Sequence, residues 1–203
     1  MKPYLIIFCL LFGFLGQAVA EGDSERGKSL SATCAACHGA DGNSFNPLWP
    51  KIAGQHENYL FYSMQLYKKG KDGGRYDVTM YPLMQNLSVQ DMKDLAAYFA
   101  SQPLKPGKSD PELQAEGKLL FMGGKLEKKL TACAACHGPM GYGNEQANFP
   151  RIGGQHALYL IDSLKKYQSG ERDTDRHAMM RDISQRMDES EMQAVANYLQ
   201  GLY

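Results

Sequence analysis

One short segment that occurs twice constrains the fold of this chain more than any other feature. Residues 33–39 read Thr-Cys-Ala-Ala-Cys-His-Gly, and ninety-nine positions later residues 132–138 read Ala-Cys-Ala-Ala-Cys-His-Gly. The shared pattern, Cys-x-x-Cys-His, is the signature for covalent attachment of c-type haem. Two copies of the pattern predict two haem c groups in one chain.

The spacing of the motif explains its chemistry. Two thiols three positions apart lie on the same side of one helical turn, so both can form thioethers with the vinyl groups at one edge of a porphyrin. The histidine that follows can then offer a neutral imidazole nitrogen to the iron. The predicted attachment residues are Cys34, Cys37, Cys133 and Cys136, and the predicted iron ligands beside them are His38 and His137.

Two other kinds of site use paired cysteines. A zinc site would need a further thiol or histidine at regular spacing near each pair, and a thioredoxin-like redox pair needs no histidine after it. Two complete Cys-x-x-Cys-His motifs therefore favour haem attachment over both alternatives.

The first twenty residues have the pattern of a secretory signal peptide. Lys2 provides a positive start, residues 5–15 form an apolar run, and residues 18–20 match the small-x-small cleavage pattern. Because the apolar run is short for a membrane span, a retained membrane anchor is the less favoured alternative. We therefore expect residues 1–20 to be cleaved and the mature chain to reach the periplasm.

Composition narrows the classes of partner. Without residues 1–20 the chain has 21 Lys and Arg against 22 Asp and Glu, a formal net charge of −1. Such a chain has no overall basic field, so nucleic acid is not an expected partner. Cys9 lies in the signal segment, and the other four cysteines all belong to the haem motifs. No cysteine remains for a structural disulfide or a catalytic thiol.

The duplication extends well beyond the haem motifs. The pattern Pro-x-Ile-x-Gly-Gln-His occurs at residues 50–56 and again at residues 150–156. Residues 101–109 contain two prolines and a glycine, which predicts a linker. We therefore expect a first domain at residues 21–100 and a second at residues 110–203. Further identities at the same offset of one hundred pair Tyr59 with Tyr159, Leu60 with Leu160, Tyr67 with Tyr167, Gly70 with Gly170 and Tyr98 with Tyr198.

Helical patterns dominate both halves, and no segment shows convincing strand alternation. Residues 57–69 and 157–169 read as amphipathic helices that end at glycines. The pattern of residues 88–91 is a capping box followed by an apolar stripe at helical spacing, and residues 188–191 repeat it. Asp110-Pro111 reads as another helix start. The predicted fold class is all-α.

The second axial ligand decides whether a haem carries electrons or supports catalysis. At the offset of one hundred, Met80 pairs with Met180 and Met92 pairs with Met192. Met92 and Met192 fall on apolar helix stripes and read as core residues. Met80 and Met180 fall in segments that we expect to be irregular, and they are the predicted thioether ligands. Met179 is an alternative to Met180 through adjacency.

Histidines offer a second set of candidate ligands. His56 and His156 are also related by the repeat, so two histidines per iron is an alternative, but their position after Gly-Gln at a helix start favours a capping or supporting role. His177 has no counterpart and is expected at the surface. Pro50 and Pro150 could place carbonyl groups beside the motif imidazoles, or could simply begin helices, and both readings stay open.

At this point the chain closely resembles cytochrome c4, a family of exported bacterial di-haem cytochromes c. The resemblance rests on the two haem motifs, the two Pro-x-Ile-x-Gly-Gln-His segments and residues 41–44, 123–126 and 198–202. It implies two tandem class I cytochrome c domains about a pseudo-twofold axis, with the haem propionates facing the domain interface. It also implies His/Met coordination of both irons, with the methionines at Met80 and Met180.

The resemblance further implies a non-enzymatic electron carrier that passes single electrons towards a terminal oxidase. Its partners would be membrane redox proteins, often with loose membrane association. Competing functions are the cytochrome subunit of a flavin dehydrogenase, a small di-haem peroxidase and a ligand-sensing module. The peroxidase would need an open iron, which the matched methionines argue against.

Overall fold

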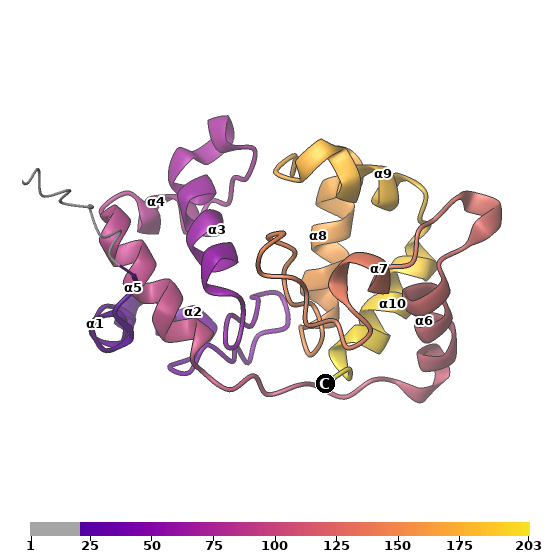
Figure 1. The fold of residues 1–203 in the computed structure, drawn as a ribbon, viewed down its shortest axis with the longest axis horizontal. Coiled ribbons are helices and arrows are strands. Elements are labelled where there is room, and N and C mark those ends of the chain that lie inside the picture. The colour runs from indigo at the N-terminus through magenta and orange to yellow at the C-terminus, as the bar shows by residue number, and fades with distance from the viewer. Residues whose placement is uncertain (1–20) are drawn as a thin grey trace, which may run out of the picture.

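The computed structural model describes residues 21–203, and the predicted signal peptide at residues 1–20 lies outside them. The described chain folds into two helical halves that lie side by side, coloured indigo to magenta and orange to yellow in Figure 1. The first half contains α1 (Ser24–Leu30), α2 (Ala32–His38), α3 (Glu57–Lys69), the 3₁₀ helix η1 (Gly70–Gly73), α4 (Met80–Met84) and α5 (Val89–Ala100). The second half contains α6 (Pro111–Gly123), η2 (Leu126–Lys128), α7 (Ala134–His137), α8 (Ala157–Ser169), η3 (Arg176–Ala178), α9 (Met179–Gln185) and α10 (Glu189–Gln200).

The all-α prediction is confirmed for the described chain. Across residues 21–203 the extended pairing is limited to two isolated bridges, Lys125–Leu130 and Asn144–Phe149. Helices α3 and α8 have the predicted bounds and end at Gly70 and Gly170, whose φ angles of 66° and 79° suit glycine.

The predicted helix starts are also present. Ser88 and Asp91 form the capping box of α5, and Asp188 and Glu191 form that of α10. In each box the side chain of either residue accepts a hydrogen bond from the backbone N–H of the other, and these two bonds stabilise the first helical turn. Asp110 accepts the Glu112 N–H at 3.0 Å before α6, with proline at the first helical position.

In each half the first helix packs against the last, and we call this pair the helix frame of that half. Helix α1 crosses α5, and α6 crosses α10, at contact points that only glycine permits. A β-carbon on Gly27 would lie 1.9 Å from the Asp94 carbonyl oxygen, and one on Gly117 would lie 2.1 Å from that of Ala194. The two helix pairs therefore approach backbone to backbone.

Apolar residues from these helices form one core in each half. The motif cysteines Cys34 and Cys133 pack against the two cores, so each haem motif is part of the apolar interior. The first core contains Leu60, Leu95, Ala96, Tyr98 and Phe99. The second contains Leu120, Phe121, Leu130, Leu160, Met187, Met192, Ala194, Val195, Ala196, Tyr198 and Leu199.

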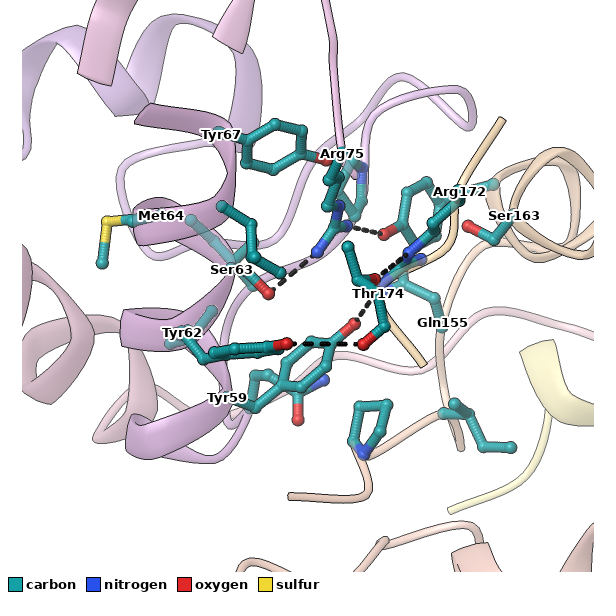
Figure 2. A pocket seen from close by; sticks show the side chains of 18 of the residues that line it. Tyr59, Tyr62, Ser63, Met64, Tyr67, Arg75, Gln155, Ser163, Arg172 and Thr174 are labelled. Carbon is teal, nitrogen blue, oxygen red and sulfur yellow. Dashed lines mark hydrogen bonds between the residues drawn. The ribbon is translucent and has the colours of Figure 1, made fainter. Parts of the chain in front are cut away.

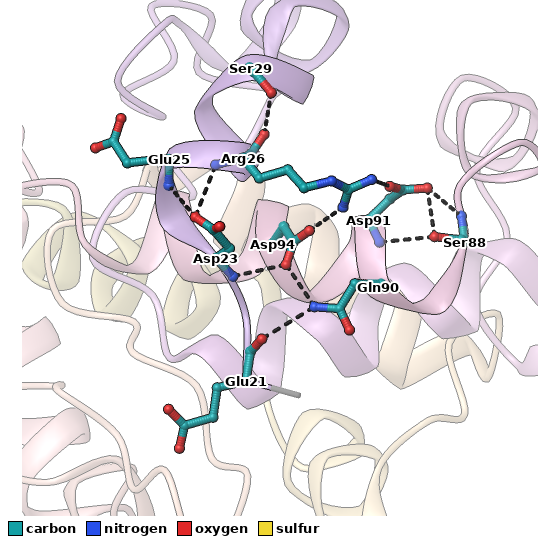
Figure 3. A network of polar contacts seen from close by, with 9 residues as sticks. All are labelled: Glu21, Asp23, Glu25, Arg26, Ser29, Ser88, Gln90, Asp91 and Asp94. Carbon is teal, nitrogen blue, oxygen red and sulfur yellow. Dashed lines mark hydrogen bonds and ion pairs between the residues drawn. The ribbon is translucent and has the colours of Figure 1, made fainter. Parts of the chain in front are cut away.

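A buried carboxylate reinforces each helix frame. In the first half (Figure 3), Arg26 binds both Asp91 and the fully buried Asp94. Burial acts to raise the pKa of Asp94, but hydrogen bonds from Asp23, Gln90 and Arg26 outweigh burial and lower that pKa. Asp94 is therefore charged in the folded protein at neutral pH.

The second half uses a different pairing for the same purpose. The buried Glu191 carboxylate accepts hydrogen bonds from Lys125 at 2.7 Å and from Lys128 at 2.8 Å. Both lysines follow α6, so this cluster ties the segment after the first long helix to α10. Burying a carboxylate is tolerable here because two cations and a backbone N–H satisfy it.

The connection between the halves runs along one side of both of them (Figure 1). Residues 103–110 have no regular structure. The Lys105 N–H donates to Asn43 in the first half at 2.8 Å, and the Gly107 N–H donates to the Gln200 carbonyl in the second at 3.0 Å. Within residues 21–203, no helix is both long enough and apolar enough to span a bilayer.

The crossing of α6 and α10 predicts opposite effects for two glycines of the same helix. Gly117→Ala should lower the free energy of unfolding by about 1–3 kcal/mol, because the added methyl group forces the two backbones apart. Gly123→Ala should raise it by about 0.5–1 kcal/mol, because open space surrounds Gly123 and alanine favours the helix. Denaturant unfolding of both variants measures the difference. Equal effects at the two positions would contradict the proposed close approach.

Candidate haem sites

A continuous cavity of about 1190 Å³ is lined by both halves. Small-molecule pockets usually occupy about 300–1,000 Å³, so this cavity is large enough for more than an ordinary ligand. All eight residues predicted to bind haem line it: Cys34, Cys37, His38, Met80, Cys133, Cys136, His137 and Met180. The fold therefore brings together two sets of residues that lie about a hundred positions apart.

The motif histidines are held by a backbone carbonyl in both halves. Nδ1 of His38 lies 2.8 Å from the carbonyl oxygen of Pro50, and Nδ1 of His137 lies 2.9 Å from that of Pro150. A nitrogen that faces a carbonyl must carry the proton, which leaves the Nε2 lone pair free for a metal. The carbonyl reading of the two prolines is thus correct.

Burial keeps both imidazoles neutral. It is the main cause that lowers the pKa of His38 and of His137, against the opposing effect of the proline carbonyls. Among the described residues, Nε2 of neither ring has a hydrogen-bond partner. A neutral ring with one fixed proton and one free lone pair is the form in which histidine binds iron.

The motif cysteines lie on the same turns as the histidines. Cys34 and Cys37 belong to α2, whereas Cys133 caps α7 and Cys136 lies inside it. None of the four forms a disulfide. Burial raises the pKa of the Cys34 thiol, and it raises that of Cys133 to about 11. All four sulfur atoms are therefore available for thioether bonds.

The two methionine segments differ from the irregular structure expected for them. Met80 is the first residue of α4 and Met180 is the second residue of α9. The short helices form because a preceding aspartate accepts their first free N–H groups. Asp77 binds the Thr79 and Met80 N–H groups at 2.8 and 2.9 Å, and Asp175 binds that of Arg181 at 2.9 Å.

The other methionines fall into two groups. Four that have no counterpart in the repeat line the cavity: Met64, Met84, Met179 and Met187. Met92 and Met192 are buried in α5 and α10 and do not line the cavity. Met179 does line it, next to Met180. The choice between Met179 and Met180 in the second half therefore still rests on the repeat.

The other histidines do not line the cavity. His56 and His156 occupy the N-cap positions of α3 and α8, but the capping role expected for their side chains is wrong, because neither makes a capping hydrogen bond. Instead Nε2 of His156 lies 2.8 Å from the Ser44 carbonyl of the other half, and Nε2 of His56 is buried without a partner. His177 is exposed, as expected.

Two glutamines from the repeated segment join the halves beside the cavity. The Gln155 side chain accepts the Lys51 N–H at 2.8 Å and donates to the Lys51 carbonyl at 2.7 Å. Gln55 makes the same pair of bonds to Arg151, both at 2.8 Å. Each half therefore gives the other the same pair of hydrogen bonds, as a pseudo-twofold relation between the halves requires. We call these four bonds the glutamine exchange.

Two arginines that no sequence pattern predicted as functional also line the cavity (Figure 2). Arg75 and Arg172 are each only 7% exposed and stack on Tyr67 and Tyr167, at 4.4 and 4.5 Å from the ring centres. The repeat does not pair them, because they lie ninety-seven positions apart and so fall outside the offset of one hundred. The repeat does pair Tyr67 with Tyr167, the tyrosines on which the two arginines stack, so these tyrosines could have pointed to the site.

The residues that line the cavity fit a covalently attached haem in each half. Each half supplies two unpaired thiols on one turn, an imidazole with a free Nε2 and a thioether. Each half also supplies one buried arginine, and within residues 21–203 neither arginine forms an ion pair with a carboxylate. A haem carries carboxylates as well as an iron, so this donor set matches both parts of the group.

Comparisons with known proteins agree with this geometry. The family model described as Cytochrome c matches residues 24–103 and again residues 114–203. Cytochrome c4 of Pseudomonas aeruginosa is 43% identical over 204 residues, which cover all of both chains. The crystal structure of reduced recombinant cytochrome c4 from Pseudomonas stutzeri aligns with a TM-score of 0.88 and 42% identity, over 90% of this chain and 100% of that one. The thiosulfate dehydrogenase electron acceptor of Thiomonas intermedia is 36% identical over 176 residues, covering 83% of this chain and 78% of that protein.

The glutamine exchange predicts a specific loss of stability. Gln155→Leu should lower the free energy of unfolding by about 1–3 kcal/mol, because it leaves a buried backbone N–H of Lys51 without a partner. Gln85→Leu is the control, since Gln85 is exposed and bonds only within its own half. Denaturant unfolding followed by circular dichroism checks both. An equal loss in the two variants would show that the exchange contributes nothing beyond an ordinary surface hydrogen bond.

Proposed function

Since this chain belongs to the cytochrome c4 family, we propose that it carries single electrons in the periplasm, within a respiratory chain that leads to a terminal oxidase. Membership establishes two tandem cytochrome c domains, two covalently bound haem c groups and the role of a di-haem electron carrier. The direction of electron flow, the partner and the individual ligands are the proposed part.

The proposed roles follow the residues that line the cavity. The four motif cysteines would form the thioethers to haem. His38 and Met80 would bind the iron of the first half, and His137 and Met180 would bind that of the second. When bound, each haem supplies an iron that alternates between the ferric and ferrous states by one electron.

The protein contributes a fixed environment for that exchange. The carbonyls of Pro50 and Pro150 hold the proton on Nδ1 and orient each imidazole. The thioethers of Met80 and Met180, once bound, would close both sites to small ligands, and His/Met ligation would favour a high potential. Both features suit transfer of electrons rather than catalysis.

The observation that carries the proposal is the matched pair of ligand sets in one cavity. Each half presents two thiols, one histidine and the methionine of the matched pair to it, beside other methionines that have no counterpart in the repeat. A di-haem peroxidase would need one iron without a methionine opposite the histidine, and the matching of Met80 with Met180 argues against that. A flavin dehydrogenase subunit would use the same ligands and differ only in its partner.

We propose export through a cleaved signal peptide at residues 1–20, and domains at residues 21–100 and 110–203 joined by residues 101–109. The signal pattern of the sequence supports export. Among the described residues, those at 103–110 lack regular structure, which supports the position of the linker.

A second candidate function is to accept electrons from a thiosulfate dehydrogenase. The relative from Thiomonas intermedia is named as such an acceptor and is 36% identical over 83% of this chain. The two candidates differ in the donor and share the same haem sites. They can be separated by assays of electron exchange.

The proposed function is tested by mixing the reduced protein with membranes that contain a terminal oxidase. We expect oxygen-dependent oxidation of the haem absorbance, and cyanide should stop it. A mitochondrial-type cytochrome c that the same membranes oxidise serves as the positive control. If that control is oxidised and this protein is not, the oxidase route is wrong. Rapid reduction by thiosulfate and its dehydrogenase would then favour the second candidate.

The ligand assignment predicts a spectroscopic result. The ferric protein should show the far-red sulfur-to-iron charge-transfer band from two centres. Met80→His and Met180→His should each remove about half of the band, because each iron has one thioether ligand in this assignment. Met92→Leu is the control, since Met92 is buried in α5 away from the cavity.

A full band in Met180→His would reject Met180 as the second ligand. Met179→His should then be measured in the same way, because Met179 also lines the cavity. Loss of half the band in that variant would transfer the assignment to Met179.

A further inference from the structure

Two buried arginines lie inside the cavity without a counter-ion, and a buried lysine of the lining, Lys51, donates its Nζ–H to the Lys105 carbonyl. Arg75 and Arg172 are each 7% exposed, and neither forms an ion pair with any carboxylate of residues 21–203. Four carboxylates do line the cavity, but they serve other groups. Asp175 pairs with Arg181, and Asp162 pairs with Lys166. Asp77 accepts the Thr79 and Met80 N–H groups, and the charge of Glu171, the fourth carboxylate, acts on Lys166.

The two charges also act on one another. Burial and the charge of Arg75 both act to lower the pKa of Arg172, but nearby tyrosine hydroxyls outweigh them and raise that pKa. Burial of an unpaired charge is costly, and two like charges in one cavity add to that cost. The protein therefore has a strong physical requirement for negative charge at this place.

Within the described chain, tyrosine hydroxyls are the groups that partly compensate the two positive charges. Burial acts to raise the pKa of the Tyr59 hydroxyl, but the charges of Arg172 and Arg75 outweigh burial and bring that pKa down to about 7. A phenol is a weak substitute for a carboxylate, whereas the planar guanidinium fork matches two carboxylate oxygens at once. A carboxylate that enters the cavity would satisfy both arginines better.

The tyrosines whose hydroxyls accept hydrogen bonds from the arginines belong to the opposite halves, whereas the tyrosines on which the arginines stack belong to the same halves (Figure 2). Arg75 donates to the hydroxyl of Tyr159 at 3.1 Å, and Arg172 donates to the hydroxyl of Tyr59 at 2.9 Å. Arg75 also donates to Ser63 of its own half at 2.8 Å. Each arginine is thus held from both sides of the boundary between the halves.

We propose that Arg75 and Arg172 are the counter-ions of the haem carboxylates, one in each half, and that Tyr159 and Tyr59 position them from the opposite half. The proposal rests on the haem-binding function above and goes beyond it. It makes the potential of each haem depend on a side chain of the other half.

The sign of the effect follows from charge. A buried cation near the haem disfavours the ferric state, which carries one more positive charge than the ferrous state. Arg75→Gln should therefore lower the potential of the first haem, and Arg172→Gln that of the second. A tenfold change in the ferric-to-ferrous ratio corresponds to about 59 mV for one electron, and we expect at least that shift.

The decisive experiment is a spectroelectrochemical titration of the holoprotein, in which the two haems give two waves. The Met80→His and Met180→His variants assign the waves, because loss of the thioether lowers the potential of the altered haem. Tyr159→Phe should move the first wave, the same one as Arg75→Gln, although Tyr159 lies in the second half. Tyr59→Phe should move the second wave.

A matched control is available in the same interface. The Tyr62 hydroxyl donates to the Thr174 carbonyl across the halves at 3.4 Å but contacts neither arginine. Tyr62→Phe should therefore leave both waves in place. If Arg75→Gln does not load two haems, Arg75→Lys should restore loading by restoring the charge, and Tyr159→Phe still decides the positioning role because it keeps both arginines.

Three outcomes would overturn the inference: Tyr159→Phe moves only the second wave, Tyr159→Phe moves neither wave, or Tyr62→Phe moves the waves as much as Tyr159→Phe does. Its failure is separate from that of the proposed function. If the protein transfers electrons to an oxidase normally but the variants leave both haem potentials unchanged, the arginine assignment alone is rejected. If the haem potentials shift as expected but the oxidase does not oxidise the protein, the oxidase route alone is rejected.

Discussion

The hydrogen bond from the Nδ1–H of each motif histidine to a proline carbonyl is the contact on which the rest of the site depends. It fixes the proton on one nitrogen and leaves the other nitrogen free for iron. The next residue along the chain after each proline is Lys51 or Arg151, and its backbone is held by a glutamine of the opposite half. A short path of hydrogen bonds therefore joins each imidazole to the other half of the molecule.

The helix frame makes this path rigid. Helix pairs α1–α5 and α6–α10 meet through glycines at backbone contact distance, and a buried carboxylate fixes each pair from the side. The motif cysteines pack directly on the cores that these helices form. An attached haem thus becomes part of an interior that is already defined, which explains how halves of about ninety residues can each support a separate site.

The two halves are similar but not equivalent. The first frame uses Arg26 with two aspartates, whereas the second uses two lysines with Glu191. The segment before Met180 contains two consecutive non-glycine residues with positive φ, His177 and Ala178, and the segment before Met80 contains none. Such backbone costs about 1–2 kcal/mol per residue. The surroundings of the two irons therefore differ even where the ligands match.

The sequence by itself determined the haem motifs, the repeat, the helix bounds at residues 57–69 and 157–169 and the capping boxes, because these features depend on spacing along a few turns. Only the tertiary structure decided how the two halves meet. Arg75 and Arg172 both line the cavity, although their positions differ by ninety-seven rather than one hundred. The segments that contain them, residues 70–80 and 170–180, have equal lengths but can follow different paths. The partners of Gln55, Gln155 and His156 lie about a hundred residues away. Contacts of that range depend on how whole helices pack, and no local pattern encodes them.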